Sequence, residues 1–156
     1  MTRIPLTPEG KEKLTEELND MKKVQRPKVI SEIAAAREHG DLKENAEYHA
    51  AREKQSLLEG RIRQFEDQLS RAEVIDAKQF PTDTVIFGMK VTIFDEAADQ
   101  EKIYRIVGEL EADTSKGLLS VGSPIAKALI GKKVGDVASV QVPGGTKDLE
   151  IVKISA

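Results

Sequence analysis

The chain has 156 residues, of which 33% are charged, and its formal net charge is only −3. That length suits one domain or two small ones, and the absence of cysteine excludes disulfides and thiolate metal sites. Residues 1–75 carry 14 basic and 15 acidic side chains and residues 76–156 carry 10 and 12, so broad attraction to a nucleic-acid backbone is not the main binding mode. No apolar run is long enough to span a bilayer and no leader is visible, so we expect a cytoplasmic protein without membrane contact.

Two apolar stripes in the first half predict an antiparallel helical hairpin. The first stripe is Leu14, Leu18, Met21, Gln25, Val29 and Ile33, and the second is Ala50, Lys54, Leu58, Ile62, Phe65 and Leu69. Read backwards, the second stripe has the same helical steps as the first, which pairs Leu14 with Leu69 and places the chain reversal near residues 41–42. Each arm of about 30 residues would extend about 45 Å at 1.5 Å per residue.

Individual residues predict where the first helix begins, where it kinks and how one seam position packs. Thr7 is a candidate N-cap for the first helix, with Pro8 at its first position. Pro27 interrupts a helical pattern that continues on both sides, which favours a kink over a helix end. Lys54 faces Val29 in the predicted register, where its aliphatic stem can pack while its ammonium reaches water.

The tip of the hairpin carries two acids whose spacing has two interpretations. Gly40 can end the first helix, and Asp41 and Glu44 follow it. Spacing alone favours a capping box, with Asp41 as N-cap and Glu44 reaching back to it. Alternatively, Asn45 is the N-cap, and both acids then lie on the loop, free to bind something.

A loop with two carboxylates has a chemical use. Mg²⁺ prefers oxygen ligands and usually keeps one or two carboxylates together with water and substrate phosphates. Two carboxylates alone should bind it weakly, so tight binding needs a second set of acids on a partner. The spacing of the acids to His39 and His49 does not form a convincing zinc site.

The second half predicts a small sheet domain, so that the chain reads as α+β. We place the hairpin at residues 1–76 with its tip near 40–45, a linker at 77–83 and the sheet domain at 84–156. Alternating apolar residues predict strands at 85–87, 91–94, 103–107, 118–121, 137–142 and 149–154 in an antiparallel sheet. One short helix is expected to begin at Pro124 after the N-cap Ser123 and to end before Gly131.

The tip sequence AAAREHGDLKENAEYHAAR, residues 34–52, resembles the hairpin tip of the bacterial Gre transcript cleavage factors, and the GreA branch most closely. The resemblance covers essentially the whole chain, including SPIAKALIGK at residues 123–132 and PGG at residues 143–145. It implies an antiparallel coiled-coil hairpin followed by an FKBP-like sheet domain. It further implies a monomeric factor, with no enzyme activity of its own, whose hairpin enters the secondary channel of RNA polymerase and stimulates cleavage of backtracked nascent RNA.

The resemblance also assigns roles to individual residues. Asp41 and Glu44 match the tip acids that help to hold the second catalytic Mg²⁺, which is shared with the polymerase and not bound tightly by the factor alone. Tyr48 matches a position near that site. Arg37 and Arg52 match the side of the hairpin that faces the 3′ end of the transcript. Ser123, Pro124 and Lys127 match the segment that docks on the polymerase, and a well-capped helix start explains the Ser-Pro pair equally well.

Two other classes of function stay open. An FKBP-like domain can be a prolyl isomerase, although the aromatic residues of this half are only Phe80, Phe87, Phe94 and Tyr104, with no Trp. A hairpin can also be a chaperone or adaptor that clasps clients. That function predicts exposed apolar residues at the tip, which offers only Leu42 and Tyr48 among charges.

Overall fold

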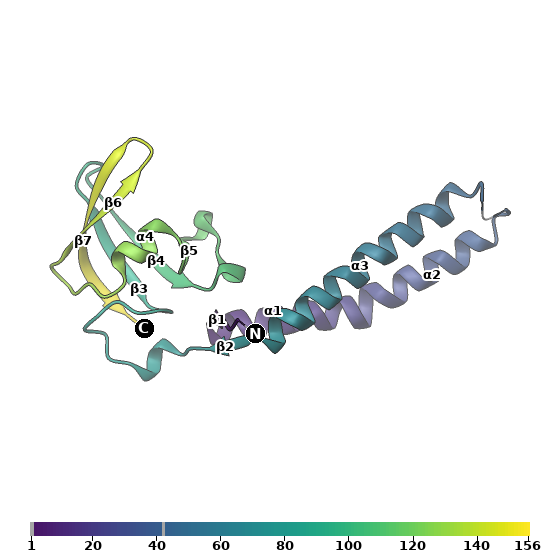
Figure 1. Cartoon of the computed structure of the whole chain (residues 1–156), viewed down its shortest axis with the longest axis horizontal. Coiled ribbons are helices and arrows are strands. Elements are labelled where there is room, and N and C mark those ends of the chain that lie inside the picture. The colour runs from purple at the N-terminus through teal and green to yellow at the C-terminus, as the bar shows by residue number, and fades with distance from the viewer. Residues whose placement is uncertain (1, 42) are drawn as a thin grey trace. The chain divides into compact units, whose positions relative to one another are not determined.

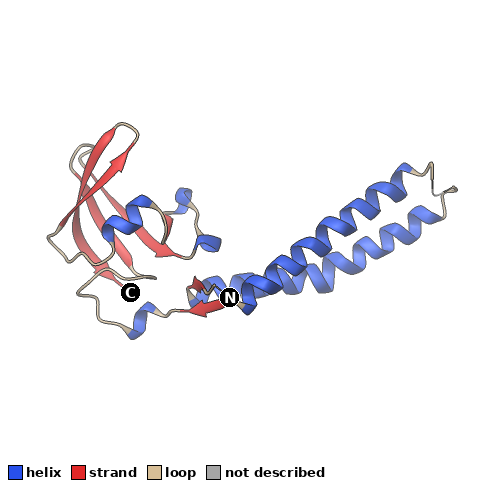
Figure 2. Cartoon of the chain, viewed as in Figure 1, coloured by secondary structure: helices blue, strands red, loops and turns tan. Residues whose placement is uncertain are grey.

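The computed structural model describes residues 2–41 and 43–156. They form two compact units, one of Thr2 with Lys11–Ala72 and one of Arg3–Gly10 with Glu73–Ala156. Figure 2 shows that the first unit is almost entirely helical, whereas the second contains most of the strands. None of the helices described has the length and apolar character needed to cross a membrane.

The predicted hairpin is confirmed. It consists of α1 (Pro8–Asp20), the π-helical segment η1 (Met21–Gln25), α2 (Arg26–Arg37) and the long α3 (Ala46–Ser70). In Figure 1, α2 and α3 run side by side in opposite directions and are joined at the tip. The predicted cap is also present, because the Gly10 N–H donates to Thr7 Oγ1 at 3.0 Å. Two short strands that the sequence did not suggest, β1 (Ile4–Leu6) and β2 (Ala72–Val74), pair with each other.

The apolar seam of α3 differs from the prediction near the tip. Ala51 is buried and Gln55 half-buried, whereas Ala50 and Lys54 are exposed, and Lys54 pairs with Glu32 at 3.3 Å. The predicted stripe took three successive steps of four residues, which rotate about 120° away from the seam on a helix of 3.6 residues per turn. Alternating steps of four and three keep the seam on the partner helix, as in a heptad repeat.

Pro27 is accommodated without ending the helical path. Proline has no N–H to donate to the carbonyl four residues earlier, and its ring crowds that carbonyl. The turn before it is therefore wider: η1 precedes α2, and the Arg26 N–H donates to the carbonyl of Met21, five residues back. The chain continues as α2, with Pro27 in its first turn.

Gly60 in the middle of α3 predicts a stabilising substitution. A Cβ at this position would meet only Arg63 Nη2, at 3.9 Å, and the residue is helical. Glycine in a helix interior costs about 0.5–1 kcal/mol relative to alanine through backbone entropy. Gly60→Ala should raise the free energy of unfolding by about that amount, measured by urea denaturation followed by circular dichroism. A loss of stability would show that the helix–helix packing needs the glycine.

The second unit contains a five-stranded sheet in the order β5-β4-β3-β7-β6. Its strands are β3 (Lys90–Asp95), β4 (Gln100–Val107), β5 (Leu118–Ser120), β6 (Val137–Val142) and β7 (Gly145–Ser155). All neighbours are antiparallel except β4 and β5, which pair in parallel, so the sheet is mixed. The connection between them contains two 3₁₀ turns, η3 (Glu109–Glu111) and η4 (Thr114–Lys116). It brings the chain back along the sheet, so that β5 runs in the same direction as β4.

The strand predicted at residues 85–87 is not formed. Val85 is fully buried, but its N–H donates to Lys132 O and its carbonyl accepts from Gly131 N, both at 2.9 Å. These bonds join two irregular segments instead of extending the sheet. The helix α4 (Pro124–Leu129) matches the prediction: Ser123 Oγ accepts from the Ala126 N–H at 3.3 Å, and Gly131 has a φ of 87°.

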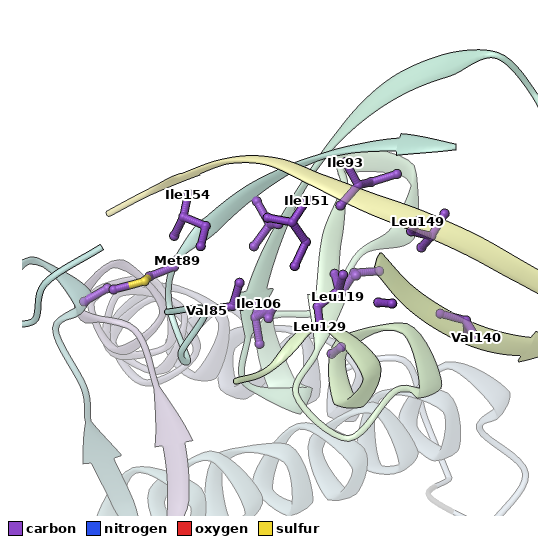
Figure 3. Packing of buried hydrophobic residues seen from close by; sticks show 14 residues of the cluster. Val85, Met89, Ile93, Ile106, Leu119, Leu129, Val140, Leu149, Ile151 and Ile154 are labelled. Carbon is purple, nitrogen blue, oxygen red and sulfur yellow. The ribbon is translucent and has the colours of Figure 1, made fainter. Parts of the chain in front are cut away.

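One apolar cluster lies between the sheet and α4. Figure 3 shows its side chains converging from the strands and from Leu129 of the helix. Ile93, Ile106 and Ile151 are fully buried at its centre. Burial of this face is what holds the unit together, at about 25 cal/mol per Å² of apolar surface removed from water.

A buried carboxylate lies at the end of β3. The Asp95 side chain accepts from Lys147 Nζ at 3.1 Å and from the Ala98 N–H at 3.2 Å. The hydrogen bond from the Lys147 ammonium is the main reason that the pKa of Asp95 is lowered. Asp95 is thus fully partnered inside the fold, and we assign it a structural role.

Candidate functional site at the hairpin tip

Asn45, not Asp41, is the N-cap of α3. The Tyr48 N–H donates to Asn45 Oδ1 at 3.1 Å, and Asn45 has an extended backbone with φ −84° and ψ 97°. The helix therefore begins at Ala46. The capping box that spacing alone favoured is absent, because Asn45 is the N-cap directly before the first helical turn and Asp41 lies four residues before that cap. The alternative interpretation, with both acids on the loop, is the one observed.

The two acids are exposed on this loop. Asp41 Oδ1 accepts from the Lys43 N–H at 3.0 Å, and its backbone carbonyl accepts from the Glu44 N–H at 3.3 Å. The Glu44 carboxylate has no hydrogen-bond or ion-pair partner among residues 2–41 and 43–156. Gly40, with a φ of 123°, adopts the positive-φ backbone that turns the chain out of α2. Counting only partners among the described residues, the loop presents one carboxylate without a partner and one that accepts from the Lys43 N–H.

Asp41 and Glu44 line the same open hollow on the surface. Its lining also includes His39, Asn45 and Glu47. His39 Nε2 lies 3.8 Å from Glu47 Oε2. Within the part of the chain that the structure describes, no group of three or more His, Asp and Glu side chains is arranged to hold a metal ion. The hollow therefore offers oxygen donors of the type that Mg²⁺ prefers but lacks a complete ligand set.

Tyr48 and Arg37 form a contact that joins the two helices at the tip. The guanidinium of Arg37 lies 5.8 Å from the centre of the Tyr48 ring, which is a cation–π distance. The ring centroids of Tyr48 and His49 are 5.6 Å apart in an edge-on arrangement. Tyr48 is half-buried and packs against the apolar seam, so its ring connects the tip to the buried residues of the hairpin.

Arg37 and Arg52 lie on the same side of the hairpin. Each directly follows a buried alanine of the seam, Ala36 or Ala51. In an antiparallel pair, the residue after a seam position turns to the same side on both helices, and ion pairs verify this. Lys22–Glu66 and Arg26–Glu59, at 3.5 and 2.9 Å, each join two residues that follow seam positions.

Residues that precede seam positions lie on the opposite side of the hairpin. Glu32 precedes Ile33 and Lys54 precedes Gln55, and these two side chains pair across the helices. The two arginines thus share a side of the tip that the Lys54–Glu32 pair does not occupy.

Comparison with known proteins decides the family. The family model described as "Transcription elongation factor, N-terminal" matches residues 4–74, and the model "Transcription elongation factor, GreA/GreB, C-term" matches residues 80–156. The chain belongs to the GreA/GreB family of transcription elongation factors. This confirms the resemblance found in the sequence.

Curated relatives of the GreA/GreB family match over nearly the full length. The transcription elongation factor GreA of Beijerinckia indica is 55% identical over 99% of both chains. That of Alkalilimnicola ehrlichii is 57% identical over 99% of this chain and 98% of its own. A solved structure, the GreA factor homolog 1 (Gfh1) protein of Thermus thermophilus, is 26% identical over 99% of both chains, with a TM-score of 0.44.

The segment for which the sequence predicted a docking role starts α4. Pro124 is its first residue, and both Pro124 and Lys127 are exposed. Among the described residues, Lys127 has no hydrogen-bond or ion-pair partner, so its ammonium is available at the surface. Ser123 is engaged by its cap and contributes to the start of the helix, as its sequence position suggested.

Two features of the tip were not found from the sequence. Glu47 shares the hollow with the two loop acids, and Asn45 donates to the carbonyl of Ala36 on the opposite helix. The spacing of three residues between Glu44 and Glu47 was the available signal for the position of Glu47. The hydrogen bond between Asn45 and Ala36 has no local signal in the sequence. Leu42, which entered the adaptor hypothesis, lies outside the described residues.

Proposed function

We propose that this chain binds RNA polymerase, inserts its hairpin tip into the secondary channel and stimulates the polymerase's own cleavage of backtracked nascent RNA. The chain has no complete active site in this proposal and is therefore no enzyme alone. It acts as a monomer in the cytoplasm, where the polymerase and the 3′ end of the transcript are its partners. The observation that carries the proposal is the pair of exposed carboxylates, Asp41 and Glu44, on a loop that Asn45 leaves outside the helix.

The carboxylates fit a shared Mg²⁺ in number and type. Mg²⁺ usually takes one or two protein carboxylates and fills its other positions with water and phosphate oxygens. Asp41 and Glu44 would supply oxygen ligands, and the polymerase's acids and the RNA phosphate would supply others. When bound in a two-metal site, the ion stabilises the attacking and leaving oxygens of a phosphodiester displacement. The chain's contribution is to hold both carboxylates at one hollow of the tip.

The basic side chains near the acids support an interaction with RNA. Arg37 and Arg52 share one side of the hairpin, and guanidinium groups bind phosphate oxygens well. The Arg37–Tyr48 contact holds one of these cations beside the acidic loop. We propose that this side faces the displaced 3′ end of the transcript, with Tyr48 near the reacting phosphate.

The α4 surface predicts a docking variant. Lys127→Glu combined with Pro124→Ala should weaken association with RNA polymerase about tenfold, because it reverses an exposed charge and alters the surface beside it. Affinity is measured by titrating labelled chain with core polymerase. Lys153→Glu, which reverses another exposed charge of the same unit, is the matched control. Equal affinities for all the chains would remove α4 from the interface.

The test of the proposed function is a transcript-cleavage assay on backtracked polymerase complexes. The parent chain is compared with Asp41→Asn and with no added factor. Stimulation by the parent that is lost in the variant supports the proposal, and no stimulation by the parent rejects it.

A further inference from the structure

The side chain of Asn45 joins the ends of both helices at the tip. Its Oδ1 accepts from the Tyr48 N–H of α3 at 3.1 Å. Its Nδ2 donates to the carbonyl of Ala36 in the last turn of α2 at 2.5 Å. One amide thus satisfies a free N–H at the start of one helix and contacts a carbonyl at the end of the other.

This bridge closes the loop that carries the acids. The chain leaves α2 after Arg37 and enters α3 at Ala46, so both Asp41 and Glu44 lie between the two bridged points. A second bond supports the loop from α3, because His49 Nε2 lies 3.2 Å from Lys43 O. Asp41 Oδ1 is then bound to the Lys43 N–H. Among the described loop residues, Asn45 is therefore bound to both helices and Lys43 is bound to His49 and to Asp41.

The chemistry of the bridge selects asparagine. It requires an acceptor for the Tyr48 N–H and a donor for the Ala36 carbonyl on one short side chain. Asparagine has both groups, whereas ionised aspartate only accepts. Serine caps a helix about as well as asparagine, and its hydroxyl can donate as well as accept, but its side chain is shorter and presents one oxygen where asparagine places two separate atoms against the two helix ends. Capping alone would not distinguish these residues.

We infer that Asn45 is a positioning residue, which fixes the distance between the two helix ends and so places Asp41 and Glu44 for a shared metal. This inference rests on the proposed function. A misplacement of reacting groups by about 1 Å can cost about 100-fold in rate. In this role Asn45 acts through the loop, because both polar atoms of its amide are used in the bridge between the helix ends.

Asn45→Ser separates the bridge from the cap. This variant keeps an N-cap acceptor but has no atom in the place of the Nδ2 that donates to the Ala36 carbonyl, whereas Asn45→Ala loses both groups. At saturating chain, Asn45→Ser should bind polymerase like the parent, cleave RNA about tenfold more slowly and need more Mg²⁺ for half-maximal rate. In the isolated chain, the NMR order parameters of the Lys43 and Glu44 N–H groups should fall from about 0.85 to below about 0.6.

The two measurements distinguish the possible failures. If the parent stimulates cleavage and Asn45→Ser matches it in rate and Mg²⁺ requirement, the positioning role is wrong while the proposed function stands. If the order parameters of the variant equal those of the parent, the bridge does not hold the loop and the inference is overturned. If the parent itself gives no stimulation, the proposed function fails, and the positioning role for a metal fails with it.

A purely structural role predicts a different pattern. Loss of hairpin stability would lower the melting temperature and the polymerase affinity together and would be larger for Asn45→Ala. Asp76→Ala, which removes the N-cap of the 3₁₀ turn η2 (Ala77–Gln79) in the other unit, is the control for such a general loss. An Asp76→Ala chain with the same rise in Mg²⁺ requirement would assign the effect to stability and reject the inference.

Discussion

An Asp41→Asn chain is expected to bind RNA polymerase like the parent and to stimulate cleavage about 100-fold less. Asparagine keeps the Oδ1 acceptor that receives the Lys43 N–H, so the loop geometry is retained. The substitution removes the negative charge and leaves a weak neutral ligand for Mg²⁺. Removing one group aimed at developing charge in an active site typically costs about 10²–10³ in rate. The measurement is the rate of RNA cleavage in backtracked complexes at saturating chain.

A neighbouring acid and the Mg²⁺ concentration test whether the Asp41 charge is the cause of the loss. Glu38→Gln neutralises another exposed acid at the end of α2, outside the hollow that Asp41 and Glu44 share, and should leave cleavage unchanged. Higher Mg²⁺ should partly restore Asp41→Asn, because the variant weakens metal affinity and not polymerase binding. Cleavage at the parent rate by Asp41→Asn would show that the loop carboxylate holds no metal.

The second large effect is expected for Gly108→Ala, which should lower the free energy of unfolding by about 3 kcal/mol. A Cβ at Gly108 would lie 2.2 Å from the backbone carbonyl oxygen of Pro5 and 3.3 Å from Leu6 Cδ2. No rotamer change can relieve a collision with backbone, so β1 or the turn at η3 must move. Urea denaturation of the full chain, followed by circular dichroism, measures the loss.

The cost of this shift is larger because the same place carries a hydrogen-bond network. Glu111 accepts from the Gly108 N–H at 3.1 Å, from the Thr7 N–H at 3.0 Å and from the Thr7 hydroxyl. Thr7 is itself buried and caps α1. Displacing the turn would leave these buried groups unpaired. Gly122→Ala is the matched control, since its Cβ would meet only Ser120 Oγ at 3.9 Å. Equal stability of both variants would show that β1 adapts freely.

The hairpin could be predicted because its signal is local and repeated. Apolar residues recur along both arms, and a helical seam is the only arrangement that buries them together. The caps Thr7 and Ser123 could be predicted for the same reason, since each bonds an N–H three residues away. The register near the tip could not, because Ala50 and Ala51 are equally apolar, and only packing against α2 selects Ala51.

In the sheet, too, local patterns could be predicted and long-range pairing could not. Alternation placed β3, β4, β6 and β7 close to their observed positions. It did not reveal that β5 pairs with β4 in parallel, because alternation reports which face is buried and not the direction of the neighbouring strand. Val85 has the composition of a strand residue, but its hydrogen bonds go to a loop that is distant in sequence.

Residue order alone determined the helical hairpin, the acids at its tip and the family to which the chain belongs, because each depends on residue types at short spacings. Tertiary structure decided whether those acids cap a helix or remain exposed. Asp41 and Asn45 are both good N-caps in sequence, and the choice falls on Asn45, whose amide also reaches the Ala36 carbonyl of the opposite helix. That second contact exists only once the two helices pack together, so no local pattern could report it.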